Sequence, residues 1–197
     1  MNDLLKTAIR RIPVWPVYVL GVSYPLWLLW QGVTGGLGVD PVKVMEHSLG
    51  KAGLQLVIAG LVITPLRNVT GISLIKYRRA IGLLAFLYIC LHLLVWLVLD
   101  VQIPSQIWGD IIKRPYITIG MAGLLLMIPL AITSNNWSVR KLGRRWKTLH
   151  KLTYVVVVLG AVHYFMQVKG FHPEPYIYVA LVLGLLASRA KNGGMFR

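Results

Sequence analysis

The chain has 197 residues, of which 56% are hydrophobic and only 14% charged, and its 21 Lys and Arg outnumber 6 Asp and Glu. So apolar a composition excludes an ordinary soluble domain of this length. The net charge of +15 would suit a nucleic-acid partner, but the positions of the charges along the chain exclude that class as well.

Six apolar segments follow one another, at about residues 13–31, 50–66, 80–99, 115–133, 149–168 and 175–190. A helix needs about 20 residues to cross a hydrocarbon core about 30 Å thick, and about 17 suffice. We therefore predict an all-α integral membrane protein, a single domain over residues 1–197 in which six transmembrane helices form one bundle. The first segment is too long for a signal peptide and no small-x-small cleavage site follows it, so we expect a retained anchor.

The basic residues gather on alternate sides of these segments. Sixteen fall on one side: Lys6, Arg10, Arg11, Arg67, Lys76, Arg78, Arg79, Arg140, Lys141, Arg144, Arg145, Lys147, Lys151, Arg189, Lys191 and Arg197. Five fall on the other, with five of the six acidic residues: Lys43, Lys51, Lys113, Arg114 and Lys169. The positive-inside rule predicts that both termini are cytoplasmic and accounts for the net charge without a nucleic acid.

Aspartate and glutamate are absent from the middle of the predicted helices, and the candidate functional residue type that remains there is histidine. His47 and His172 lie in polar connections, where we expect ordinary solvated side chains. His92 and His163 lie inside the third and fifth segments, where an ionisable group is costly and usually faces the bundle interior. The single cysteine, Cys90, excludes a disulfide within the chain and a thiolate metal cage.

The depths of His92 and His163 match. The third and fifth segments run in the same direction, and the two residues lie about 18 and 21 Å from the cytoplasmic ends at 1.5 Å per residue. Two facing imidazoles on neighbouring helices could bind the iron of one haem between them. The alternatives are two unrelated, hydrogen-bonded histidines, a histidine-based proton or ion transporter, and a membrane anchor without redox function.

His150 precedes His163 by 13 residues, which turns an ideal helix through about 220°. The two histidines therefore share a face only if the helix is bent or begins near residue 150. The residue 13 positions before His92 is Arg79, so these two inner positions offer one histidine and one arginine. They cannot form a second site with two histidine ligands, and His150 is a third candidate haem ligand.

Basic residues cluster at the cytoplasmic starts of the third and fifth segments. Exposed amides at helix N-termini favour anions, so a flavin phosphate or a quinone headgroup could bind there. The alternative is a cluster that only touches lipid phosphates. The candidate residues for this edge are Arg78, Arg79, Arg144 and Arg145.

Several stretches resemble a known family. KYRRAIGLLAFLYICLHLLVWL and RRWKTLHKLTYVVVVLGAVHYF resemble the ferric reductase-like transmembrane domain of NADPH oxidases and metalloreductases. ITPLRNVTG and LAITSN resemble, more narrowly, the MsrQ type, the haem-binding membrane subunit of the bacterial periplasmic methionine sulfoxide reductase. The similarity runs from the first predicted helix to the sixth.

The resemblance implies an electron-transfer subunit in the bacterial inner membrane. It implies haem b held by His92, His163 and His150, and FMN as a further cofactor. The donor would be the quinone pool or a flavin reductase, and the acceptor a periplasmic molybdopterin-containing methionine sulfoxide reductase subunit that performs the catalytic reduction. The larger oxidases carry histidine at the place of Arg79, and their cytoplasmic flavin and nicotinamide domain has no counterpart here. We expect the partner to dock on the connections 32–49, 100–114 and 169–174.

Overall fold

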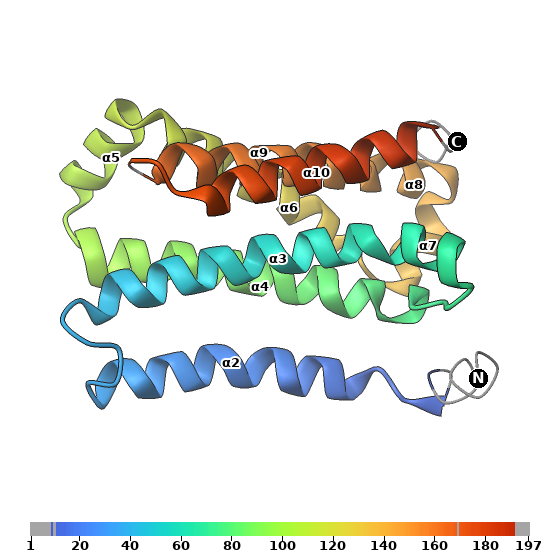
Figure 1. Ribbon diagram of the computed structural model, residues 1–197, viewed down its shortest axis with the longest axis horizontal. Helices are drawn as coiled ribbons and strands as arrows, with labels where there is room; N and C mark the ends of the chain where they lie inside the picture. The colour runs from blue at the N-terminus through green and yellow to red at the C-terminus, as the bar shows by residue number, and fades with distance from the viewer. Residues whose placement is uncertain (1–8, 10, 169, 192–197) are drawn as a thin grey trace.

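The computed structural model describes residues 9, 11–168 and 170–191, which form helices and no strand. In chain order these are α2 (Trp15–Val33), α3 (Pro41–Thr70), η1 (Ile75–Tyr77), α4 (Arg78–Val95), η2 (Trp96–Val101), α5 (Pro104–Lys113), α6 (Pro115–Ile132), α7 (Asn136–Leu142), α8 (Arg144–His150), α9 (Leu152–Gln167) and α10 (Pro173–Lys191). The long helices lie side by side along one axis (Figure 1). The all-α prediction is confirmed.

Four helical stretches are long and apolar enough to cross a membrane: Pro41–Thr70, Ile75–Val101, Pro115–Ile132 and Arg144–Gln167. They match the second to fifth predicted segments, of which the fourth and fifth were predicted to end one residue later. The first and sixth segments form α2 and α10, helices of 19 residues each that are not among the four. A count of six membrane-crossing helices and the cytoplasmic placement of the termini therefore stay predictions. Lys6, Arg10, Lys169 and Arg197, which contribute to the topology prediction, lie outside the described residues.

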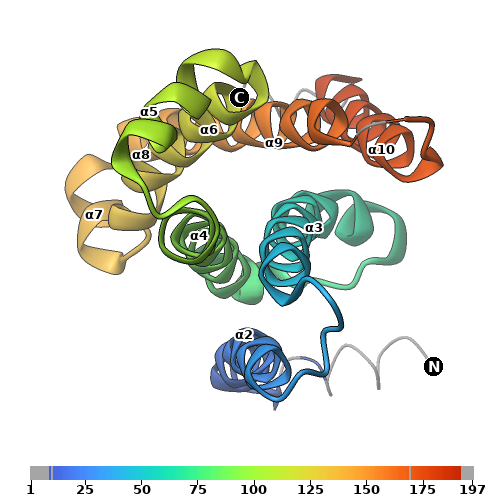
Figure 2. The same cartoon turned by 90° about the vertical axis from the view of Figure 1, so that its left-hand side faces the viewer.

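The helices form three layers, which the end-on view shows (Figure 2). The outermost layer is α2, the middle one holds α3 and α4, and the third holds α6, α9 and α10. The main core lies between the middle and third layers, where Val57 of α3, Ala85 of α4 and Val157 of α9 are buried together. A smaller core joins α2 to α3 and α4 around Leu28 and Leu49.

Helix α3 begins nine residues before the predicted segment. The Asp40 carboxylate accepts a hydrogen bond from the Lys43 amide at 3.1 Å, and Pro41 occupies the first helical position. Both features favour a helix start. The helix ends at Thr70 and is followed by Gly71, whose φ of 71° lies in the left-handed region that glycine tolerates. Residues 41–49 were predicted to belong to a polar connection, but they form the first turns of α3 and place Glu46 in the bundle.

The structure also places helices in predicted connections. Helix α5 lies within 100–114, and α7 precedes the fifth segment. The fifth segment itself is divided, because α8 ends at His150 and α9 begins at Leu152. His150 and His163 therefore belong to different helices. The 13-residue spacing then no longer determines the angle between their side chains.

Candidate haem site

His92 and His163 meet inside the bundle, from α4 and α9. Their ring centroids are 6.2 Å apart, and the ring planes make an angle of 81°. Two imidazoles that bind one metal ion from opposite sides, each nitrogen about 2 Å from it, have centroids about 6 Å apart. The spacing of this pair therefore fits two axial ligands of one iron.

Each imidazole is oriented by a backbone carbonyl of a neighbouring helix. His92 Nδ1 lies 2.9 Å from Glu46 O of α3, and His163 Nδ1 lies 2.7 Å from Tyr116 O of α6. A carbonyl only accepts, so Nδ1 of each ring carries the proton and donates. The neutral ring then keeps the lone pair of Nε2 on its far side, free to bind a metal.

Two glycines make these contacts close. A Cβ at Gly50 would lie 3.0 Å from His92 Nδ1, and one at Gly120 would lie 2.8 Å from His163 Nδ1. Each glycine stands four residues after the carbonyl that accepts from the histidine, on the same helix face. Both imidazoles are therefore held by the same arrangement, a carbonyl and a glycine one turn later.

The ligand set suits a porphyrin better than a bare ion. In the part of the chain that the structure describes, no group of three or more His, Cys, Asp and Glu side chains could hold a metal ion. Two imidazoles supply two ligands, and the equatorial nitrogens of a porphyrin supply the remainder. The residues present thus fit haem.

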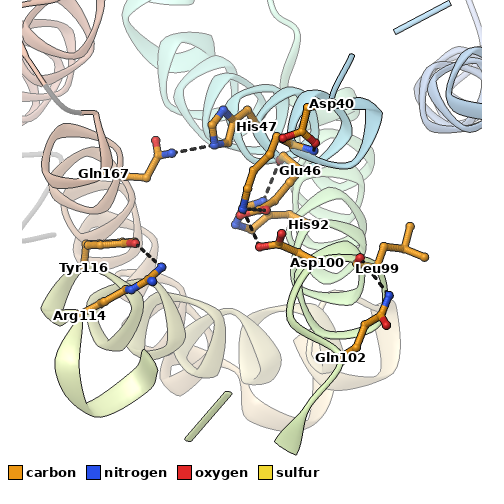
Figure 3. Close-up of polar contacts among 11 residues, drawn as sticks. Asp40, Glu46, His47, His92, Leu99, Asp100, Gln102, Arg114, Tyr116 and Gln167 are labelled. Atoms are coloured by element: carbon orange, nitrogen blue, oxygen red, sulfur yellow. Dashed lines mark hydrogen bonds and ion pairs between the residues drawn. The ribbon is translucent and has the colours of Figure 1, made fainter. Parts of the chain in front are cut away.

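Polar side chains surround the site at the Pro41 end of α3 (Figure 3). Lys43 Nζ lies 2.6 Å from Asp100 Oδ2 and 3.8 Å from Glu46 Oε2, which is buried. Across the site, Gln167 Nε2 donates to His47 Nε2 at 2.7 Å. His47 is exposed, as predicted, but it has this specific partner.

A polar hollow of about 580 Å³ opens beside Lys43 and Asp100. It is lined by Lys43, Asp100, Val101, Ser105, Gln106, Gly109, Asp110, Lys113 and Arg114. Most of these residues belong to the predicted connection 100–114, so the hollow lies where a partner was expected to dock.

The comparisons with known proteins agree with this geometry. Residues 49–161 match the family described as ferric reductase like transmembrane component. The haem-binding subunit MsrQ of protein-methionine-sulfoxide reductase from Brucella anthropi is 49% identical over 177 residues, 89% of this chain and 80% of that protein. The chain belongs to the MsrQ family. MsrQ from Brucella ovis is 51% identical over the same shares, and no solved structure matches the chain.

His150, the third histidine predicted from resemblance to this family, has a different environment. It stacks on Trp146 with ring centroids 3.9 Å apart, and its Nε2 lies 3.0 Å from Thr133 Oγ1. The Thr133 hydroxyl donates its one proton to Pro129 O at 2.6 Å, so it accepts from His150. In this arrangement Nε2 is protonated and has no lone pair for iron, and a ligand role for His150 stays a prediction.

The four arginines of the candidate flavin or quinone edge differ in their surroundings. Arg78 donates to Thr64 Oγ1 of α3. Arg79, Arg144 and Arg145 are exposed near the starts of α4 and α8. His172 is exposed, and Cys90 is a partly buried free thiol. The flavin or quinone role of these arginines therefore stays a prediction.

Sequence reasoning found His92 and His163 but not the groups that orient them. Gly50 and Gly120 each lie near one end of a predicted helix, where glycine gives no distinct signal. Glu46 was placed in a connection. The available signal was the helix start at Asp40 and Pro41, because α3 carries three glycines and α6 carries two, and the sequence does not tell which of them approaches a histidine.

Proposed function

We propose that the chain is the membrane electron-transfer subunit of a bacterial periplasmic methionine sulfoxide reductase system. Electrons would come from the quinone pool or a cytoplasmic flavin donor and reach a periplasmic, molybdopterin-containing catalytic subunit. The observation that carries the proposal is the His92–His163 pair with both Nδ1 atoms bound to carbonyls. Family membership supports it, because the named relatives are haem-binding subunits.

In this proposal His92 and His163 hold the iron of a b-type haem, which supplies reversible one-electron chemistry when bound. The Glu46 and Tyr116 carbonyls fix each ring, and they keep Nε2 deprotonated. Two histidine ligands would suit a haem that transfers electrons rather than one that binds a substrate at the iron. The proposed setting is the inner membrane, with six crossing helices and both termini in the cytoplasm.

The polar hollow and the Lys43–Asp100 pair give the partner a surface close to the histidines. Lys43 contacts Asp100 and Glu46, and Glu46 O accepts from His92. A partner bound at the hollow would therefore be connected to His92 of α4 through Lys43 and Glu46. FMN as a second cofactor rests on the family resemblance alone and belongs to this proposal.

The visible spectrum of purified protein tests the haem assignment. After expression with sufficient haem we expect a Soret band that is lost in His92→Ala and in His163→Ala. His172→Ala, a substitution of an exposed histidine, is the matched control and should keep the band. Full haem content in both ligand variants would show that the ligand assignment is wrong. The absence of a Soret band in the unsubstituted protein would contradict the proposed electron-transfer function.

A further inference from the structure

A buried arginine lies at the end of the bundle opposite the polar hollow. Arg189 of α10 is 8% exposed. Its guanidinium donates to Leu61 O of α3 at 2.7 Å and to Tyr154 Oη of α9 at 3.0 Å, and its buried Nε has no partner. A buried charge is costly unless an opposite charge balances it, and these two oxygens are neutral.

Two more arginines lie beside it. Arg78 donates to Thr64 Oγ1, three residues along α3 from Leu61. Arg67 follows Thr64 by three residues, and both Arg67 and Arg189 lie close enough to Arg78 to act on its charge. Three helices thus bring three guanidinium groups together at this end of the bundle. We call Arg67, Arg78 and Arg189 the arginine cluster.

No carboxylate of the described chain balances the arginine cluster. None of the three forms an ion pair with a described residue. The described acidic residues lie at or beyond the opposite ends of the same helices: Asp40, Glu46, Asp100, Asp110 and Glu174. An anion from outside the described chain would relieve the repulsion among the three groups.

An apolar groove of about 640 Å³ lies beside the cluster, between α3 and α10. Near the cluster it is lined by Ile63, Leu66, Leu74 and Ile81, which are close in sequence to Thr64, Arg67 and Arg78. It continues along α3 to Gln55, eleven residues from Leu66, or about 16 Å of helix. That length suits an alkyl chain lying along the helix surface.

We propose that the arginine cluster and this groove bind one anionic phospholipid. The phosphate lies on Arg67 and Arg78, Arg189 adds positive charge beneath it, and one acyl chain fills the groove. A flavin nucleotide carries similar phosphate chemistry but no chain for the groove. The site lies beyond the proposed electron-transfer function and does not require haem.

Native mass spectrometry of the full chain in mild detergent tests the proposal. Phosphatidylglycerol, phosphatidylcholine, FMN and inorganic phosphate are titrated separately. We expect phosphatidylglycerol to be retained, with binding about fivefold weaker in each of Arg67→Gln and Arg78→Gln, and phosphatidylcholine and inorganic phosphate not to be retained. FMN that binds elsewhere on the chain should bind to these two variants as it does to the unsubstituted chain. Arg144→Gln and Arg145→Gln remove equal charge from exposed positions on α8 and should not change binding.

A second pair of variants tests the groove without altering charge. Ala59 lines the groove, and Ala59→Phe should displace the chain and weaken phosphatidylglycerol binding. Leu125→Phe enlarges an exposed apolar residue of α6 that does not line the groove, so it should leave phosphatidylglycerol binding unchanged. The proposal is wrong if the cluster and groove variants bind phosphatidylglycerol as the unsubstituted chain does. It is also wrong if FMN or inorganic phosphate binds through Arg67 and Arg78 in place of the lipid.

Discussion

Gly50 and Gly120 determine how closely each imidazole approaches the neighbouring helix. A methyl group at either position would lie at or within 3.0 Å of a histidine Nδ1, so the ring must move and its bond to the carbonyl must lengthen. The groups that orient a metal ligand commonly contribute 10- to 100-fold to metal affinity. The two glycines are therefore as important for the proposed site as the carbonyls.

We expect Gly50→Ala and Gly120→Ala each to weaken haem binding by about tenfold, because the imidazole loses its orientation. The measurement is a titration of haem into protein prepared without it, followed at the Soret band. Gly82→Ala on α4 is the control, since a Cβ there meets nothing within 4 Å. Equal haem affinity in all three variants would contradict the role of the glycines.

His150 allows a second prediction for a single residue. Because its Nε2 donates to Thr133, we expect His150→Ala to keep the low-spin electron paramagnetic resonance signal of a haem with two imidazole ligands. His163→Ala should abolish this signal. The two variants are compared at equal protein concentration. Loss of the signal in His150→Ala would place His150, rather than His92 or His163, in the ligand pair.

Helix α3 supports the site, since it carries Glu46 and Gly50 and packs on α4 and α9. Its start depends on the cap formed by Asp40. We expect Asp40→Ala to lower the free energy of unfolding by about 1 kcal/mol, and Asp40→Asn, which also caps, to have little effect. Thermal unfolding in detergent measures both. Equal destabilisation by the two substitutions would point to the charge of Asp40 instead.

The helices were predictable where hydropathy alone decides them. Each of the four middle segments overlaps one of the four helical stretches that could cross a membrane. The start of α3 was missed because Lys43, Glu46 and His47 interrupt the apolar pattern, although Asp40 and Pro41 marked a helix start. The break between His150 and Leu152 falls at two polar residues, His150 and Lys151, which are compatible with a continuous helix as well, so only the structure shows it.

The His92–His163 pair was predictable because equal depth on parallel helices is a one-dimensional property. The carbonyl that each ring binds was not, because it depends on how two helices are rotated against each other. The arginine cluster was missed for the same reason. Arg67, Arg78 and Arg189 are far apart in sequence, and Arg189 reads as one more basic residue at a helix end.

At the scale of the whole molecule, the charges divide between the two ends of the bundle. The described acidic residues lie toward the end of the bundle at which α3 begins, two of them (Asp100 and Asp110) in the lining of the polar hollow, and the arginine cluster lies toward the opposite end. This division agrees with the predicted topology, in which the arginine end faces the cytoplasm. The orientation can be measured at the two ends of α3.

Single cysteines in a Cys90→Ala background give that measurement. Val39 lies just before α3 and Val69 lies in its last turn, and the two residues are 105% and 86% exposed. We expect Val39→Cys to react in intact spheroplasts with a maleimide that cannot cross the membrane, and Val69→Cys to react only after the membrane is opened. The reverse pattern would invert the topology, and with it the proposed positions of the donor and the partner.

The two carbonyls that orient the imidazoles belong to the backbone, so no side-chain substitution removes them. Glu46 and Tyr116 can change identity while their carbonyls stay in place, provided that α3 and α6 keep their helical path. The charge beside the haem site can therefore vary independently of ligand geometry. Within such a scaffold, reduction potential and partner preference could be altered at position 46 without rebuilding the iron site.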